Sequence, residues 1–435
     1  MNEYYKKIEL QNGFTMRLIN DHKNKEDLNI VNKQKKISNS NQNFNKQVLI
    51  KSELNKNVIS NKLNEINHDM NNQNEMNENS ENNPEIFLVV LLNEGNTTYI
   101  VSVLQCLRNI KYIENYYLKH LKDIENNLNN ALISYVFSRA IYNLNPSSQR
   151  KDKKNSYNLT SFKKALVHSN HIFNGKSTKN AIDFLVYLLN TLHEEDKKLA
   201  HWKNLYMAFN ENLKADTIKY INYLSKNDKS IIFDTFCYTL ETTRTCWECK
   251  TINTNIQKYF TFELNFEKAL NKTALMYKKE FSIEDCISIH FEKQTMYNVF
   301  CEKCDEKRDF SVDLAFNFGP PFFIFILRLN DREDLIEKMR SNDIKIKIDE
   351  EINVFSYVKK SQESCLIYKL NGAIFFDTKK EKGYIAYCKN NIDDNWYKFE
   401  INKINKVQSS EVLNISKEGS LLPVILFYNK IKNKV

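Results

Sequence analysis

Two pairs of cysteines with the spacing Cys-x-x-Cys constrain the fold of this chain more than any other feature of its sequence. They lie in CWEC, which holds Cys246 and Cys249, and in CEKC, which holds Cys301 and Cys304. A gap of two residues lets both sulfurs of a pair reach one ion, and four thiolates form the tetrahedral shell that zinc prefers. The pairs are farther apart than in a compact zinc ribbon, so the fold has to bring two hairpins together. We therefore predict a structural zinc ion; the alternative is that the cysteines coincide by chance.

The remaining cysteines and the apolar segments bear on where the protein works. Nine cysteines are an odd number, and the start of the chain has no apolar signal core, so a disulfide framework is not expected. No stretch reaches the roughly 18 apolar residues that a membrane span requires. We expect an intracellular protein, in the cytoplasm or the nucleus, with no membrane partner. The other cysteines are expected to be core residues: Cys106, Cys237, Cys286, Cys365 and Cys388.

Composition divides the chain near Pro84. Residues 1–84 are rich in Asn, Lys, Glu and Ser, and such a segment cannot bury enough apolar surface to offset the entropy of ordering. We predict a disordered Asn/Lys-rich tail, with a tail that recruits partners as the alternative. Residues 85–435 are predicted to form the folded domain.

The apolar pattern of this domain changes along its length. Apolar residues at helical spacing predict an amphipathic helix after Thr98 and a second helix in STKNAIDFLVYLLNTLHEE, with Ser177 and Thr178 as caps. From about Asp234 onward, short runs of aromatic and β-branched residues predict strands. Helices followed by strands favour an α+β fold.

The formal net charge of +9 is the sequence feature closest to a nucleic-acid footprint. The lysines are spread along the chain, whereas nucleic-acid binding is typical of a concentrated basic stripe. No Arg-rich run or aromatic RNA motif is present. The sequence therefore argues against a nucleic-acid partner.

Several segments, taken in order, resemble the ubiquitin-specific proteases. NEGNTTYIVSVLQCL is similar to their cysteine box, Asn-x-Gly-Asn-Thr-Cys-Tyr, and TKNAIDFLVYLLNTLHEE to the helix that reads Gln-Gln-Asp-Ala-x-Glu-Phe-Leu. The two cysteine pairs resemble the zinc site of the fingers. PPFFIFILRL, KGYIAYCKNNIDDNWYKFEI and LLPVILFYNK look like the Leu-Pro-x-x-Leu strand, the histidine box and the closing strand. The resemblance covers about residues 87–430.

This resemblance implies a papain-like cysteine-protease fold. It would have a helical thumb at about residues 85–230, zinc-bearing β fingers at about 231–318, and a β palm at about 319–435. It also implies a chemistry in which a cysteine thiolate attacks the isopeptide carbonyl. A histidine takes the thiol proton, an Asp or Asn orients the histidine, and an Asn helps to bind the oxyanion.

The residues at the catalytic positions depart from that pattern. Thr98 stands at the nucleophile position, and either Gly383 replaces the histidine or the histidine is deleted beside it. Glu400 occupies the orienting position and Asn93 the oxyanion position. The last histidine of the chain is His290, before the second cysteine pair. The resemblance therefore implies the scaffold of a protease site without its nucleophile and base.

Two functions follow from this pattern. The first is a pseudo-deubiquitinase that binds ubiquitin, a ubiquitin-like protein or another protein partner as a scaffold. The second is an active deubiquitinase with unusual residues, for example Thr98 as nucleophile and Lys382 as base.

Cys106 lies eight residues after Thr98, about 12 Å along a helix, which is too far to replace the nucleophile. Lys179 and Asn180 stand where the family has Gln-Asp, which weakens the capture of a basic ubiquitin tail.

Overall fold

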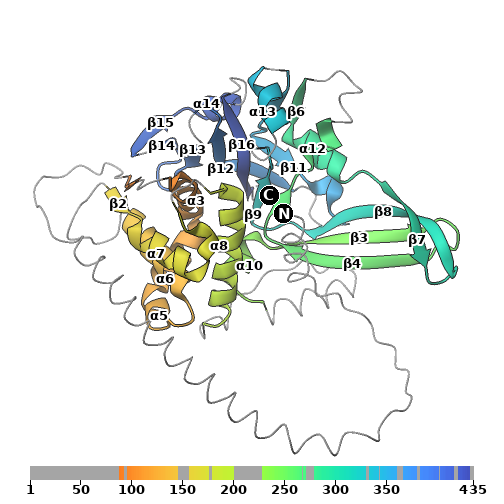
Figure 1. Ribbon diagram of the computed structural model, residues 1–435, viewed down its shortest axis with the longest axis horizontal. Helices are drawn as coiled ribbons and strands as arrows, with labels where there is room; N and C mark the ends of the chain where they lie inside the picture. Colours follow the sequence, from red (N-terminus) through yellow and green to blue (C-terminus); the bar gives the residue numbers. More distant parts are fainter. Residues whose placement is uncertain are drawn as a thin grey trace, which may run out of the picture. The chain divides into compact units, whose positions relative to one another are not determined.

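A computed structural model provides the structure of the protein (Figure 1). It describes residues 88–92, 96–145, 156–175, 179–199, 228–266, 268–270, 279–329, 333–341, 343–359, 366–379, 383–400, 402–415 and 420–431. They all belong to one of the two units into which the chain divides, residues 66–435. The predicted tail and its boundary at Pro84 lie outside the described residues, as do Asn93, Cys365 and Lys382. The boundaries between thumb, fingers and palm stay predictions.

The first part of the described chain is mainly helical, and its central helix is α3, Thr98–Arg108. This helix contacts α4, α6 and α8 as well as strands β12 to β14. All 11 of its residues are buried, including Ser102, Gln105 and Arg108. The predicted helix is therefore confirmed, and its polar residues are buried along with its apolar ones. The neighbouring helices are α4 (Lys111–Lys119), α5 (Leu121–Glu125), α6 (Leu132–Leu144), α7 (Thr160–Ser169), η2 (His171–Phe173), α8 (Ala181–Asp196) and α10 (Ile231–Phe236).

The second predicted helix is α8, and its start differs from the prediction. Its N-cap is Asn180, whose side-chain oxygen accepts a hydrogen bond from the backbone N–H of Ile182 at 2.8 Å. The predicted caps, Ser177 and Thr178, lie outside the described residues, and the cap assignment is wrong. An asparagine serves as well as Ser or Thr because its carbonyl oxygen reaches the same unpaired amides of the first turn.

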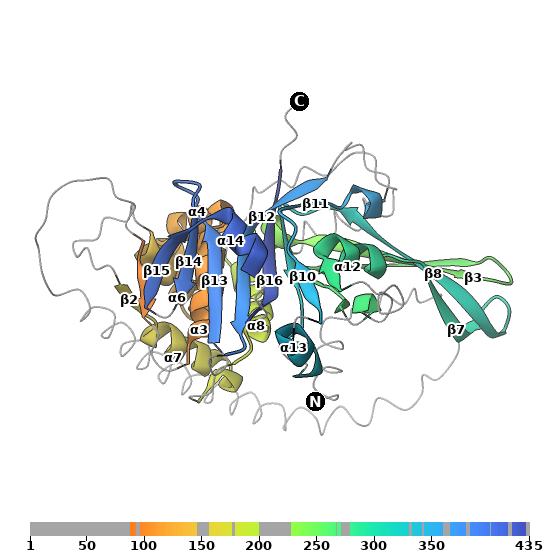
Figure 2. The same ribbon diagram turned by 90° about the horizontal axis from the view of Figure 1, so that it is seen from above.

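The largest sheet of the described part has the strand order β15-β14-β13-β12-β16-β9-β5, with β11 paired to β12. Figure 2 shows β15, β14, β13, β12 and β16 side by side. Every pair is antiparallel except β5 with β9. The bounds are β5 Phe262–Glu263, β9 Phe322–Ile326, β11 Glu351–Asn353, β12 Ile367–Asp377, β13 Gly383–Lys389, β14 Trp396–Glu400, β15 Lys403–Val407 and β16 Leu421–Lys430.

Strand β16 lies inside this sheet although it contains Pro423. Proline has no N–H for a sheet ladder and is found at irregular positions of a strand. Pro423 pairs with Phe375 of β12 at a register shift between Ile374 and Phe375. The irregularity lets the apolar run LLPVILFYNK continue as one buried strand.

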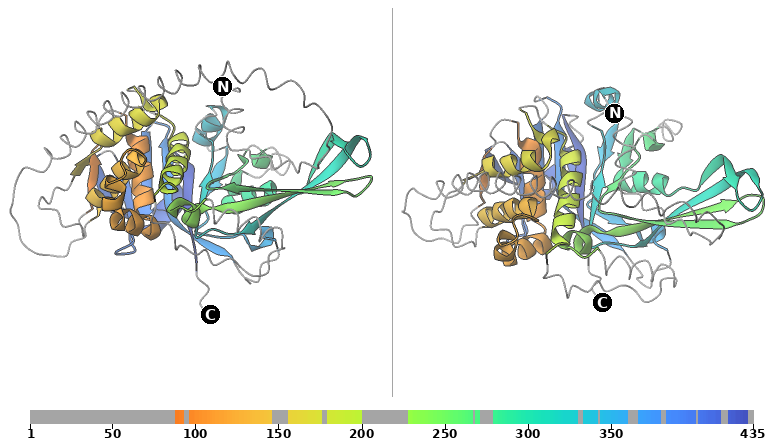
Figure 3. Two further views of the ribbon diagram at one scale, coloured as in Figure 1. Left: turned by 90° about the horizontal axis from the view of Figure 1, so that it is seen from below. Right: turned by 60° about the horizontal axis from the view of Figure 1, so that its bottom comes forward.

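A second sheet holds both cysteine pairs and has the order β4-β3-β8-β7, antiparallel throughout. Figure 3 shows its strands as two long hairpins side by side. The bounds are β3 Tyr238–Cys246, β4 Ile252–Tyr259, β7 Gln294–Cys301 and β8 Glu306–Phe318. The run TFCYTLETTRT is therefore mostly strand, as expected, but its first residues belong to the short helix α10.

Smaller elements, which the sequence pattern did not predict, complete the described chain. Strands β1 (Val90–Leu92) and β2 (Ser156–Asn158) pair in parallel, as do β6 (Glu280–Ser282) and β10 (Lys345–Lys347). Three α-helices and one 3-10 turn lie among the later strands: α12 (Ile283–His290), α13 (Glu333–Arg340), η3 (Phe355–Tyr357) and α14 (Ser409–Asn414). In the described residues, no helix combines the length and the apolar character needed to cross a membrane.

Candidate functional site

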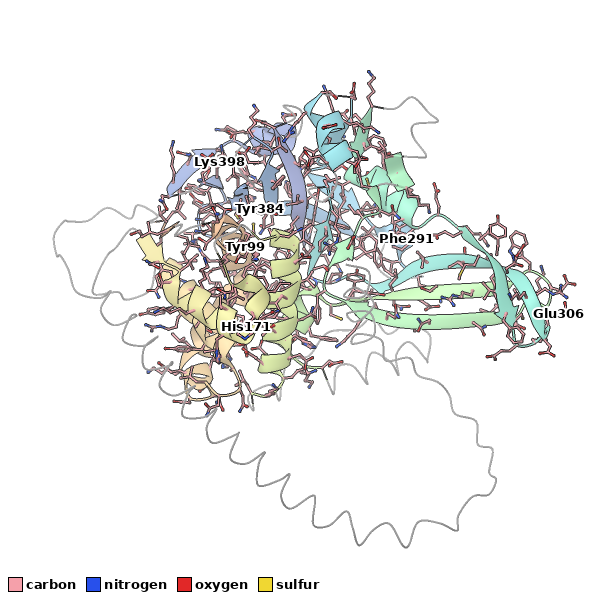
Figure 4. All side chains as sticks on the ribbon, viewed as in Figure 1. Tyr99, His171, Phe291, Glu306, Tyr384 and Lys398 are labelled. Carbon is pink, nitrogen blue, oxygen red and sulfur yellow. The ribbon has the colours of Figure 1, made fainter. Side chains whose placement is uncertain are left out.

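The start of α3 meets the start of β13, which brings two of the predicted site positions together. Oγ1 of Thr98 accepts a hydrogen bond from the backbone N–H of Tyr384 at 3.2 Å. Helix α3 begins at Thr98, and the carbonyl of Thr97 accepts its first hydrogen bonds, from the N–H groups of Ile100 and Val101 at 2.9 and 3.0 Å. Thr98 is only 6% exposed. Figure 4 labels Tyr99 and Tyr384, which mark the two elements that meet.

Gly383 is the first residue of β13 and lies next to this contact. A Cβ atom added at Gly383 would meet nothing within 4 Å, so the backbone leaves open space for a side chain. The strand itself is fixed, because Tyr384 is buried and its ring packs against Phe376 with the centroids 5.5 Å apart. The position therefore has room for a larger residue beside Thr98.

Glu400, at the predicted orienting position, is the last residue of β14. Its Oε1 lies 3.1 Å from Nζ of Lys398, so the carboxylate already has a cation on the same strand. Both side chains are about a quarter exposed or less. Asn93, at the predicted oxyanion position, lies outside the described residues.

A second carboxylate, which was not among the predicted site residues, lies beside Gly383. Asp377, at the end of β12, is the direct cross-strand partner of Gly383. It is 6% exposed and accepts a hydrogen bond from the N–H of Lys379 at 2.9 Å. The sequence offers one signal for Asp377, an acidic residue directly after the apolar run AIFF. Only the pairing of β12 with β13 shows that this residue lies opposite Gly383.

The last imidazole of the sequence belongs to His290, at the end of α12. Its ring packs against Phe262 and Phe291 with centroids 4.7 and 5.5 Å away. Burial, and then the charge of Lys268, lower the pKa of His290 to about 4. This ring is part of an aromatic cluster, and strand β13 supplies no imidazole beside Thr98.

The four paired cysteines converge at the end of the β4-β3-β8-β7 sheet. Their sulfurs all lie within 4.8 Å of one another, with 4.0 Å between Cys246 and Cys304 and 3.6 Å between Cys249 and Cys301. Four thiolates around one zinc ion at about 2.3 Å would be about 3.8 Å apart. The cluster therefore fits a single tetrahedral ion, and these residues could hold one.

The two cysteine turns are built alike, which explains the convergence. The N–H of Lys250 bonds back to the carbonyl of Cys246 at 3.2 Å, and the N–H of Asp305 to the carbonyl of Cys301 at 2.9 Å. Lys250 and Asp305 both have positive φ angles, 57° and 56°. The side chain of Phe310 is buried with the cluster. Two equivalent turns thus face each other, as the spacing of the sequence predicted.

Comparison with known proteins settles the family. The family model described as ubiquitin carboxyl-terminal hydrolase (UCH) matches residues 89–428. The chain belongs to this family. Ubiquitin carboxyl-terminal hydrolase 4 of Saccharomyces cerevisiae is 22% identical over 378 residues, which cover 79% of this chain and 39% of that protein. Ubiquitin carboxyl-terminal hydrolase 12 of the same species is 26% identical over 202 residues, 42% of this chain and 16% of that one. The chain thus spans well under half of these relatives.

A solved structure places this family member among proteins of the same fold. That solved structure is the SAGA DUB module of Ubp8, Sgf11, Sus1 and Sgf73 bound to monoubiquitin. The TM-score is 0.58 at 18% identity, and the match covers 82% of this chain and 72% of the chain in that structure. The predicted α+β, papain-like fold is therefore confirmed, and the order of landmarks along the sequence led to the correct family.

Proposed function

We propose that the chain is a pseudo-deubiquitinase: a family member that binds ubiquitin or a ubiquitin-like protein as a scaffold and does not cleave isopeptide bonds. One observation carries the proposal. The two positions that should hold a cysteine and a histidine hold Thr98 and Gly383, and the hydroxyl of Thr98 accepts a hydrogen bond from the N–H of Tyr384.

The chemistry of a threonine at this position supports the loss of activity. A hydroxyl becomes an effective nucleophile only when an adjacent base takes its proton. Strand β13 reads GYIAYCK and contains no imidazole. When nucleophile and base act as a unit, losing either costs about as much as losing both, roughly a million-fold in turnover in a serine protease.

Binding of ubiquitin is proposed from the relatives. The DUB module of similar fold is bound to monoubiquitin, and the match extends over 82% of this chain. A protein–protein interface buries a large surface, so binding does not depend on the few catalytic residues alone. The partner protein itself stays open between ubiquitin and a ubiquitin-like modifier.

We further propose that zinc is the ion of the four-cysteine cluster. The ligands are all thiolates, the coordination shell is closed, and no position is left for substrate, which is typical of a structural site. Cys246, Cys249, Cys301 and Cys304 would hold the ion and clamp the two hairpin turns together. The ion would supply folding free energy and would take no part in any reaction.

The experiment that tests the function measures binding and cleavage on the same preparation. Titration calorimetry with mono-ubiquitin should give saturable binding, while a fluorogenic ubiquitin substrate should show no turnover. Thr98→Ala is the matched control and should leave binding unchanged. Hydrolysis by the natural chain that disappears in Thr98→Ala would instead support an active enzyme with Thr98 as nucleophile and Lys382 as base. Absence of binding to ubiquitin and to ubiquitin-like modifiers would reject the scaffold.

A further inference from the structure

Two cysteines outside the four-cysteine cluster lie in contact in the core. The Sγ atoms of Cys106 and Cys388 are 3.3 Å apart, and the two side chains are 2% and 1% exposed. Cys106 is on α3, about two helical turns after Thr98. Cys388 is on β13, the strand that begins at Gly383. The two sulfurs thus lie in contact between α3 and β13, the same helix and strand that meet at Thr98.

The geometry leaves the two sulfurs room to come together. A disulfide has an S–S distance of about 2.05 Å, so the sulfurs would have to approach by about 1.3 Å. Gly372 of β12 is the cross-strand partner of Cys388, and a Cβ there would lie 3.6 Å from Sγ of Cys106. Because Gly372 has no side chain, nothing from this position crowds the pair.

We propose that Cys106 and Cys388 form a reversible disulfide when a hydroperoxide oxidises them, and that this bond fastens α3 to β13. The proposal is independent of the proposed function, because it concerns the core and not the binding of ubiquitin.

The reaction balances with hydrogen peroxide as the oxidant. The thiolate of one cysteine attacks a peroxide oxygen, the O–O bond breaks, and a sulfenic acid forms while the hydroxide takes up the thiol proton as water. The sulfur of the other cysteine then attacks the sulfenic sulfur, the S–S bond forms, and a second water leaves. Two thiols lose two electrons and two protons, and one peroxide becomes two waters.

Burial determines the rate of this reaction. Burial raises the pKa of the Cys106 thiol well above its usual value, and the hydrogen bond and charge of Cys388 raise it further. Since the thiolate is the reactive form, oxidation is slow while α3 and β13 stay together and proceeds when they separate locally. The bond, once formed, opposes further separation.

The test uses the full chain, saturated with zinc and treated with hydrogen peroxide, then unfolded in an alkylating agent and mapped by mass spectrometry. We expect a crosslink between the peptides that contain Cys106 and Cys388, lighter by two hydrogens and reversed by dithiothreitol. Cys237 is an internal control: it is as buried, but its sulfur contacts the carbonyl of Tyr238 at 3.7 Å, and it should remain alkylatable.

A second readout follows the contact between α3 and β13. In the oxidised chain, hydrogen exchange of the Tyr384 amide should slow at least about threefold, because the bond suppresses local opening. Cys106→Ser and Cys388→Ser should abolish both the crosslink and the slowing. Full alkylation of both cysteines after oxidation, or crosslinks only to other cysteines, would overturn the proposal. If a serine variant fails to fold, the peptide map of the natural chain decides alone.

Discussion

The backbone N–H of Tyr384 donates a hydrogen bond to Oγ1 of Thr98 over 3.2 Å, which joins the first residue of α3 to the second residue of β13. The two residues are far apart in the sequence, and the helix and strand that carry them pack together. The hydroxyl at the predicted nucleophile position therefore has a structural partner. Gly383, next to this hydrogen bond, leaves open space beside it.

The first prediction concerns rebuilding the site. Thr98→Cys alone should give weak labelling by thiol-directed ubiquitin probes: the start of a helix favours a thiolate, but no histidine takes its proton. Thr98→Cys combined with Gly383→His should label at least about tenfold faster, because general-base catalysis contributes roughly 10²–10⁴-fold when its geometry is correct. The measurement is the rate of probe labelling at equal protein concentration.

The control for this prediction is Thr98→Cys with Gly383→Ala, which adds a side chain without a base. It should label no faster than Thr98→Cys alone. Equal rates for the histidine and alanine double variants would show that the open space at Gly383 does not bring an imidazole to the nucleophile.

The second prediction concerns removal of the metal. A strong chelator should release about one zinc per chain and raise the hydrogen exchange of β3, β4, β7 and β8, because the energy of the site is partly folding energy. The amides of α3 and β12 should stay protected. Elemental analysis and exchange mapping measure the two effects, and Cys249→Ser should reproduce them without a chelator. A well-folded preparation that contains no zinc would contradict the assignment.

The sequence predicted the parts of the fold that depend on local pattern. The apolar spacing after Thr98 located α3, and the spacing of Cys246 and Cys249 located one turn of the metal cluster. It did not reveal that α3 is buried on every side, because burial depends on which elements pack around a helix. For the same reason Asp377 was missed, since its position opposite Gly383 exists only after β12 and β13 pair.

One missed element did have a sequence signal. Helix α12 begins with a capping box, in which Ser282 and Asp285 exchange hydrogen bonds between side chain and backbone. The pattern Ser-x-x-Asp before an apolar run is a recognised start of a helix. Helix α12 lies after Asp234, in the part of the chain for which strands were predicted.

The third prediction uses two glycines with opposite surroundings. A Cβ at Gly319 would overlap the hydroxyl of Tyr368, which is fully buried and donates a hydrogen bond to the carbonyl of Pro320 at 2.9 Å. Gly319→Ala should therefore lower the free energy of unfolding by about 1–3 kcal/mol. Gly383→Ala is the matched control and should be neutral or stabilising by up to about 1 kcal/mol, because it meets no atom and restricts the unfolded chain. Chemical denaturation of both variants measures the difference, and similar losses at the two positions would refute the steric argument.

The last prediction concerns His193, which lies buried where α8, α10 and β4 meet. Its Nδ1 is 2.6 Å from Oγ of Ser230, and its Nε2 is 3.4 Å from Nζ of Lys258. A lysine ammonium can only donate, so its contact with Nε2 favours a neutral ring, whereas Oδ1 of Asp228, 3.7 Å from Nε2, favours the protonated ring. The carboxylate oxygens of Asp228 lie 2.9 Å from Nζ of Lys258 and 3.1 Å from Nζ of Lys197.

Protonation of this ring would oppose the fold. Burial lowers the pKa of His193 below its usual value of 6.5; the charges of Lys258 and Lys197 lower it further, and Asp228 opposes them. The unfolded chain therefore binds a proton at a pH where the folded chain does not. Stability is fully present above about pH 6.5 and falls as the pH drops toward the lowered pKa, with a slope of at most about 1.4 kcal/mol per pH unit from this group.

His193→Gln should flatten this dependence, because glutamine keeps a polar side chain and does not titrate. Denaturation between pH 7 and pH 5 should give the variant a smaller slope than the natural chain. A residual slope is expected from His290, whose pKa is lowered to about 4. His168→Gln, on the exposed side of α7, is the control and should keep the natural slope. Identical slopes for the natural chain and His193→Gln would mean that the ring is not held neutral by its neighbours.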